Sequence, residues 1–236
     1  MIGRCIPFSR VSRIAAIGAA TVLVGTVVFL LAQYPALPDV LPVHFKRGGL
    51  PDGWQYKTLG RVLLPAFIQA SLALTFGAIA LLLMSRPSGG HQPDAPDVRA
   101  ASAAAETVLL VAAIWITFQA YTAFALVRVW LTGYGNLGRL FSAFELLGLL
   151  LTGAAAVRGH ARVGRPAPRP YVPEHWRFGQ LYKNADDPAL FVPTRDGCKW
   201  TLNFGRPVAA ALLGVVLAVG VLGPTLILVL ALRYNF

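Results

Sequence analysis

A histidine and an aspartate stand eight residues apart in a connecting segment rich in glycine, proline and aromatic residues. The segment reads PVHFKRGGLPDGWQYKT over residues 42–58 and contains His44 and Asp52. Its three glycines permit tight turns. Folded back in this way, the two side chains can meet as a hydrogen-bonded pair or as part of a ligand or metal site. The alternative is that each side chain caps a local turn.

Two further residues complete the candidate ligand site. Trp54 is typical of the membrane–water interface, where its ring would anchor the returning strand. Lys57 adds a positive charge three residues later. His44 and Asp52 are too few to complete a metal coordination sphere, so no metal is predicted.

A second candidate is an ion pair inside two apolar segments. The turn TGYGNLG joins these segments, and residues at equal depth in such a hairpin should have numbers that add to about 273. Arg128 and Glu145 satisfy this relation. A charge within the membrane is costly unless it is paired, so an intramembrane ion pair is predicted. The alternative is that Glu145 relays protons or cations in a small transporter.

The sequence contains no recognisable catalytic motif. No nucleophile elbow, phosphate-binding loop, HExxH helix or dinucleotide fingerprint occurs. We therefore expect a protein that is not an enzyme, with no catalytic residues and no cofactor.

The composition is that of a multi-pass membrane protein. Hydrophobic residues make up 56% of the 236 residues and charged residues only 13%, about half the usual share in soluble domains. Each of five apolar segments is long enough to cross a bilayer as a helix. They are residues 14–32, 59–84, 104–127, 140–157 and 207–232.

The basic residues predict the orientation of these segments. Of the 21 Lys and Arg residues, 14 lie in segments on one side of the predicted membrane and seven on the other. The positive-inside rule then places the N-terminus in the cytoplasm and the C-terminus outside, with the 42–58 segment facing outward. Because this topology accounts for the net charge of +11, binding to nucleic acid is not expected. The expected location is a bacterial inner membrane.

The predicted fold is an all-α polytopic membrane protein with about five transmembrane helices. A small cytoplasmic cap of short strands lies between the fourth and fifth helices, where turn signals alternate with strand-forming runs such as LYK, LFVP and WTLNF. The predicted parts are residues 1–84 with the outward loop, a cytoplasmic linker at 85–103, a helical hairpin at 104–157, the cap at 158–206, and the last helix at 207–236.

The 42–58 segment resembles a membrane-domain signature of bacteria. That signature combines Pro-x-His-Phe, a glycine, and Asp-Gly with an aromatic residue and a lysine directly after a first helix. It belongs to an uncharacterised domain found in relatives of the sporulation-delay-toxin immunity protein. The matching residues are Pro42, His44, Phe45, Gly49, Asp52, Gly53, Trp54 and Lys57.

The predicted cap is similar to a second uncharacterised domain, which follows the first in many bacterial proteins. The matching residues are Trp176, Tyr182, Asn184, Asp187, Pro188, Phe191, Val192, Pro193, Arg195, Gly197, Trp200, Thr201, Asn203 and Phe204.

These resemblances imply a binding or signalling protein similar to immunity proteins. We expect the outer loop to bind an envelope ligand, a peptide or a membrane-protein partner, and the bilayer to be the other partner. The alternatives are an accessory subunit of a larger membrane complex and a small transporter that uses Glu145.

Overall fold

The computed structural model describes residues 4–46, 49–86, 96–133, 137–166 and 168–218. The chain divides into two compact units. Unit 1 comprises Met1–Ser9, Gly77–Val108 and Arg158–Phe236. Unit 2 comprises Arg10–Phe76 and Leu109–Val157.

Among the described residues, four helical segments are long and apolar enough to cross a membrane. This finding indicates a mostly helical, multi-pass membrane protein. The predicted fifth segment begins as α6 (Pro207–Leu217), and most of the rest lies outside the described residues. The four candidate spans are Arg10–Ala36, Leu64–Met84, Pro96–Thr132 and Leu140–Val163.

Two helix boundaries differ from the predicted ones because of proline and alanine residues. The predicted helix from residue 59 is divided into α2 (Leu59–Val62) and α3 (Leu64–Met84), because Pro65 has no N–H to continue the ladder. Helix α4 (Pro96–Thr132) begins eight residues early, so part of the predicted linker is helical. Proline is tolerated at a first helical position, and the alanine-rich run that follows has high helix propensity.

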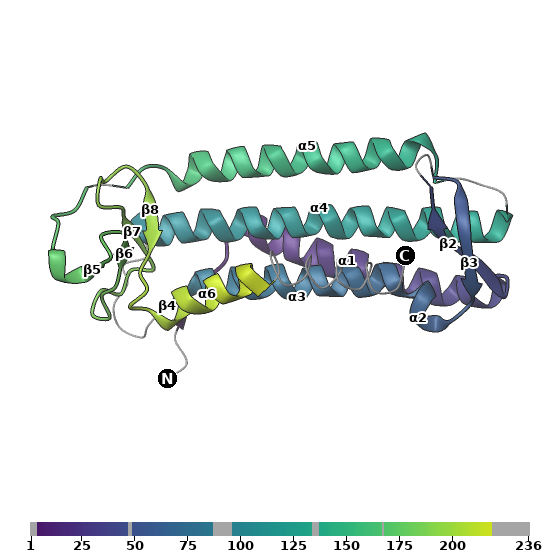
Figure 1. Ribbon diagram of the computed structural model, residues 1–236, viewed down its shortest axis with the longest axis horizontal. Helices are drawn as coiled ribbons and strands as arrows, with labels where there is room; N and C mark the ends of the chain where they lie inside the picture. The colour runs from purple at the N-terminus through teal and green to yellow at the C-terminus, as the bar shows by residue number, and fades with distance from the viewer. Residues whose placement is uncertain (1–3, 47–48, 87–95, 134–136, 167, 219–236) are drawn as a thin grey trace. The chain divides into compact units, whose positions relative to one another are not determined.

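The core of unit 2 joins α1 (Arg10–Gln33), α3 and α4 (Figure 1). Gln69 of α3 is fully buried, and its Nε2 donates to Thr26 Oγ1 of α1 at 3.1 Å and to the Ile116 carbonyl of α4 at 2.8 Å. Such hydrogen bonds hold helices together where no water competes. Helix α5 (Gly138–Val163) packs on α4 through Tyr121 and Phe144, whose rings stack at 4.2 Å.

Unit 2 also contains the predicted outward loop, which forms a β-hairpin at the end of its helices (Figure 1). After a short 3-10 turn, η1 (Tyr34–Ala36), strand β2 (Val40–Phe45) pairs antiparallel with β3 (Pro51–Tyr56). Leu41 of β2 is completely buried in the helix core, so the hairpin is part of the packed structure of unit 2.

Unit 1 contains the predicted cap, built from two short hairpins. Strand β5 (Trp176–Arg177) follows η2 (Pro173–His175) and pairs with β6 (Leu181–Tyr182), and β7 (Phe191–Pro193) pairs with β8 (Trp200–Leu202). The three runs expected to form strands each contain one. A further pair, β1 (Arg4–Cys5) and β4 (Ser85–Arg86), was not anticipated.

Candidate functional site

The register of the β2–β3 hairpin turns the histidine toward the aspartate. Pro42 pairs with Trp54 and His44 pairs with Gly53, so β2 carries one extra residue between these pairs. A second irregularity follows directly, on the β3 side, where Asp52 stands between the pairs formed by Gly53 and Pro51. Bulges of this kind re-aim side chains next to functional sites.

Of the two alternatives for His44 and Asp52, the structure has the hydrogen-bonded pair. Nδ1 of His44 makes a short hydrogen bond with Oδ1 of Asp52. The histidine side chain is 62% exposed and the aspartate 27%. When a neutral imidazole donates its Nδ1–H to a carboxylate, its Nε2 is left as an acceptor. The pair therefore presents an oriented imidazole on an accessible face of the hairpin.

The other two predicted ligand residues have different environments. Trp54 is 58% exposed and lines an open groove of about 510 Å³ with Tyr56 and Arg61. Lys57 is largely buried at the hairpin base. Its ammonium donates to the Leu37 carbonyl at 2.6 Å and lies 5.2 Å from the centre of the Tyr34 ring. Lys57 thus holds the hairpin in place.

The hairpin is fixed at its base and near its turn. Trp130 of α4 donates its Nε1–H to the Pro42 carbonyl at 2.9 Å, and both residues are buried. Near the turn, the Leu137 N–H donates to the Gly49 carbonyl at 3.2 Å. The His44–Asp52 pair therefore stands on a strand that is bonded to the helix core.

Gly53 is required for the close approach of the two strands. A Cβ at this position would lie 2.9 Å from the Cβ of His44, which cannot rotate away. We expect Gly53→Ala to lower the free energy of unfolding by about 1–3 kcal/mol, because the strands must separate. Thermal unfolding in detergent measures this loss. Gly60→Ala is the matched control, because its Cβ would meet open space and should change stability little. Equal effects of the two variants would contradict the steric account.

The second predicted constellation, Arg128 with Glu145, is not brought together. Both side chains are exposed, and the ion pairs between described residues do not include this one. The helix register explains why. Trp115 donates to Thr152 Oγ1 at 3.1 Å, so facing residues have numbers that add to about 267 rather than 273. Glu145 therefore lies at the depth of about residue 122 of α4, six residues before Arg128.

Unit 1 contains a charged cluster that sequence reasoning missed. Glu106 of α4 is buried and accepts hydrogen bonds from Arg158 at 2.5 Å, from Arg162, and from Ser9 Oγ at 2.7 Å. The two arginines are one helical turn apart on α5. Glu106 stands at the start of the predicted segment 104–127, and Arg158 directly follows the predicted segment 140–157. In an antiparallel hairpin these two positions lie at the same end, so the observed register would have indicated the contact.

Close helix packing makes the cluster possible. Gly159 lies next to Arg158, and a Cβ there would lie 2.0 Å from Thr107 Oγ1. Small residues of this kind let helix backbones approach each other. Helix α5 also continues to Val163, six residues past its predicted end, and this extension carries Arg162 to Glu106.

In the cap, the predicted motif residue Asn203 forms the centre of a hydrogen-bond network. It is completely buried. Its Nδ2 donates to the carbonyls of Asn184 at 2.8 Å, Asp187 at 3.1 Å and Ala189 at 3.2 Å. Its Oδ1 accepts from the backbone N–H of Asn184 at 3.1 Å and of Gly205 at 2.9 Å. Asn203 therefore joins the loop after β6 to the end of β8.

Three more motif residues continue this network. Asp187 accepts hydrogen bonds from Tyr182 Oη and from Arg169, each at 3.1 Å. Burial, reinforced by the negative charge of Asp187, raises the pKa of Tyr182 above its usual value. The phenol thus stays protonated and donates to the carboxylate. The Asn184 carboxamide accepts from the Asp186 N–H at 3.0 Å and shapes the turn.

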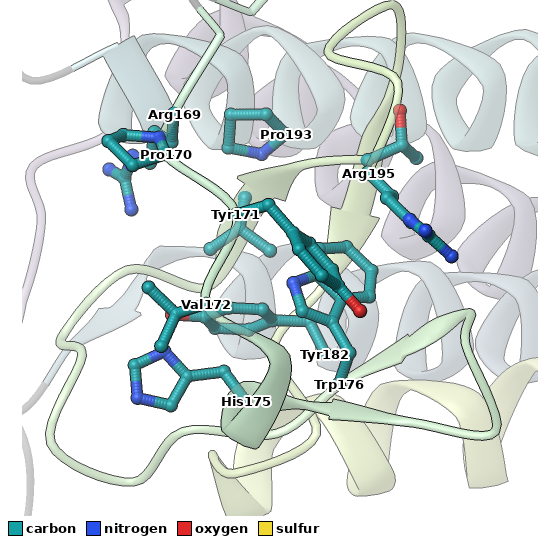
Figure 2. Close-up of a pocket in the computed structure, with 11 residues that line it drawn as sticks. Arg169, Pro170, Tyr171, Val172, His175, Trp176, Tyr182, Pro193 and Arg195 are labelled. Carbon is teal, nitrogen blue, oxygen red and sulfur yellow. The ribbon is translucent and has the colours of Figure 1, made fainter.

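Three further motif residues of the cap, Trp176, Arg195 and Trp200, are partly or fully exposed. Trp200 donates its Nε1–H to the Gly164 carbonyl at 3.0 Å, which connects β8 to the segment after α5. Trp176 and Arg195 line a pocket with Tyr182 (Figure 2). Tyr171 and His175 also line this pocket and were not among the predicted site residues. Their position just before the motif was the available signal.

Comparison with known protein families gives a match that covers the hairpin. Residues 21–68 match a family described as Domain of unknown function (DUF1648). The matched residues include all of β2 and β3 and thus the His44–Asp52 pair. No curated protein and no solved structure shows a significant match. Part of the chain, including the hairpin, is therefore similar to an uncharacterised domain.

Proposed function

We propose that this chain is a non-enzymatic, multi-pass protein of a bacterial inner membrane that binds an envelope ligand, peptide or membrane-protein partner through its β2–β3 hairpin. Its role would be similar to that of immunity or signalling proteins. In this proposal five helices cross the membrane, the N-terminus and the cap lie in the cytoplasm, and the hairpin and C-terminus face outward.

The observation that carries this proposal is the His44–Asp52 pair. A hairpin that only connected two helices would need no oriented imidazole on an exposed bulge. Beside the pair, Trp54 and Tyr56 are 58% and 76% exposed. Exposed aromatic rings near oriented polar groups are typical of binding surfaces, because the rings give large contact areas and the polar groups give specificity.

The anchoring of the hairpin also favours binding. Lys57, Trp130 and the buried Leu41 hold the strands before any partner arrives. A surface that is already ordered loses little conformational entropy when it binds. The hairpin therefore resembles a preformed recognition element more than a mobile linker.

The proposed orientation gives a direct prediction. A reporter fused after Arg165 should report the cytoplasm, and one inserted near Lys46 should report the exterior, because 14 of the 21 basic residues then lie inside. Paired phosphatase and fluorescent-protein fusions measure this. The reverse pattern would contradict the orientation and place the hairpin in the cytoplasm.

Substitutions in the pair test the binding function. We expect His44→Gln and Asp52→Asn each to reduce partner recovery from native membranes by about tenfold. His44→Gln removes the imidazole, and Asp52→Asn removes the negative charge that strengthens its hydrogen bond. Thermal stability should change little, because the pair is exposed. The measurement is quantitative mass spectrometry of co-purified proteins and lipids beside thermal unfolding.

The matched control is Lys46→Gln, an exposed substitution in the same hairpin outside the pair. It should leave recovery at the wild-type level. Wild-type recovery by both His44→Gln and Asp52→Asn would refute the binding function and leave a purely structural pair.

A second function, that of an accessory subunit, is favoured by Glu145. This carboxyl is exposed on α5, and only 11% of the most apolar window of that span is buried. A carboxylate facing lipid is costly, whereas a basic residue of a neighbouring helix would compensate it. If this function holds, Glu145→Leu should abolish co-purification of a membrane protein, and the His44 and Asp52 variants should not.

A further inference from the structure

The cap contains a pocket of about 250 Å³ that is distinct from the hairpin. It lies between the segment that precedes β5 and the strands β6 and β7. At this size it is slightly smaller than the usual sites for drug-sized molecules, which begin at about 300 Å³. The volume therefore limits the occupant to a small organic molecule.

Three aromatic rings form the apolar part of this pocket (Figure 2). The rings of Trp176 and Tyr182 meet edge to face at 5.3 Å, and Tyr171 lies 6.3 Å from Trp176. His175 contacts Tyr182 at 5.7 Å. Flat rings with restricted positions favour a flat or apolar body in the occupant.

Two side chains of the pocket, Arg195 and Trp176, offer hydrogen-bond donors. The guanidinium of Arg195 stacks over the Tyr171 ring at 4.7 Å, which leaves its planar N–H groups at the edge of the pocket. The indole N–H of Trp176 donates to no described residue, whereas that of Trp200 is satisfied by a backbone carbonyl. Within the part of the chain that the structure describes, the donors of Trp176 and Arg195 thus have no hydrogen-bond acceptor.

The charge of the lining has one sign. Two arginines and a histidine line the pocket, and no aspartate or glutamate does. The nearby carboxylate of Asp187 is occupied by Arg169, Tyr182 and the Ala189 N–H. The carboxylate of Asp196, next to Arg195 in the chain, accepts hydrogen bonds from Thr194 Oγ1 and the Cys198 N–H. The ion pairs between described residues do not include Arg195.

We propose that the cap pocket binds a small anion in which a carboxylate or phosphate is attached to a flat apolar body. The anionic group pairs with the guanidinium fork of Arg195 and the Trp176 indole N–H. The flat body lies against Tyr171 and Tyr182. Planar oxyanions fit an arginine fork through two parallel hydrogen bonds, which a neutral molecule cannot replace.

The test follows the Trp176 indole N–H in the full chain by ¹⁵N NMR of tryptophan-labelled protein in detergent micelles. The signal is assigned by its loss in Trp176→Phe. Four probes are titrated: benzoate, phenyl phosphate, the neutral benzamide and inorganic phosphate. The dissociation constant obtained from the signal shift should be at least about tenfold lower for benzoate or phenyl phosphate than for benzamide or inorganic phosphate. Only benzoate and phenyl phosphate combine a negative charge with a flat body. Which of the two binds better identifies the anionic group.

Two arginine substitutions, each of which removes one positive charge, complete the test. Arg195→Gln should lower the affinity for the preferred probe by about tenfold. Arg177→Gln is the matched control, because Arg177 is adjacent to Trp176 but does not line the pocket. If Arg195→Gln does not fold, Arg195→Lys replaces it in the test. This variant keeps the positive charge and loses the planar guanidinium, so it should also weaken binding of the preferred probe. Equal binding of benzoate and benzamide, equal weakening by the two arginine substitutions, or no shift with any probe would overturn the proposal.

Discussion

Glu106→Gln is expected to lower the free energy of unfolding by about 3–5 kcal/mol, because it leaves two arginines facing a neutral buried group. Glu106 is only 2% exposed and accepts hydrogen bonds from Arg158, Arg162 and Ser9. Replacing it breaks the connection between Ser9, α4 and the end of α5. Thermal and chemical unfolding in detergent measure the loss.

Glu145→Gln is the matched control for this substitution. It makes the same chemical change on α5, but Glu145 is exposed and bonds to no described residue. Its effect on the isolated chain should be below about 0.5 kcal/mol. Adding Arg158→Gln to Glu106→Gln should recover part of the loss, since fewer charges remain uncompensated. If Glu145→Gln were the more damaging substitution, the register and the charged cluster would both be wrong.

Asn203→Ala is expected to destabilise the cap by about 2–4 kcal/mol, because it leaves several buried backbone groups without hydrogen bonds. The lost contacts are two backbone N–H groups and three carbonyls at 2.8–3.2 Å. The expected sign of unfolding is faster trypsin cleavage at the exposed Lys183 and Arg195. Pulse proteolysis of the full chain measures this.

Asn203→Asp distinguishes the two halves of the network. The carboxylate can still accept from the two N–H groups, but it faces three carbonyl oxygens to which it cannot donate. It should therefore be at least as damaging as alanine. Gln180→Ala, which replaces an exposed polar residue in the β5–β6 hairpin, is the control. Trypsin should cleave this variant at the wild-type rate. Wild-type resistance of Asn203→Asp would contradict the assigned donor role of the carboxamide.

Features set by local sequence were the ones that sequence reasoning predicted. Apolar length and few charges predicted helices that can span a membrane, and alternating strand and turn signals predicted the short strands of the cap. A contact between His44 and Asp52 was one of two alternatives that the sequence left open, because the glycines between them permit tight turns. In each case the determining residues are close together in the chain.

Features that depend on register were not predicted. The expected Arg128–Glu145 contact assumed that the turn fixes which residues face each other, and an offset of a few residues separates them. The same offset joins Glu106 to Arg158 and Arg162. The cap pocket depends on bringing Tyr171 and Arg195 together, and no local pattern specifies a contact over that separation.

The central claim is that the β2–β3 hairpin binds a specific occupant, and site-specific photo-crosslinking in native membranes tests it most directly. A benzophenone amino acid replaces Tyr56, which is 76% exposed beside Trp54, and separately replaces Leu74, which is 74% exposed on α3. The proposal predicts a discrete adduct from position 56, of one mass, that disappears when His44→Gln is added. Position 74 should give only lipid adducts. No discrete adduct from position 56, or one that persists unchanged with His44→Gln, would contradict the claim.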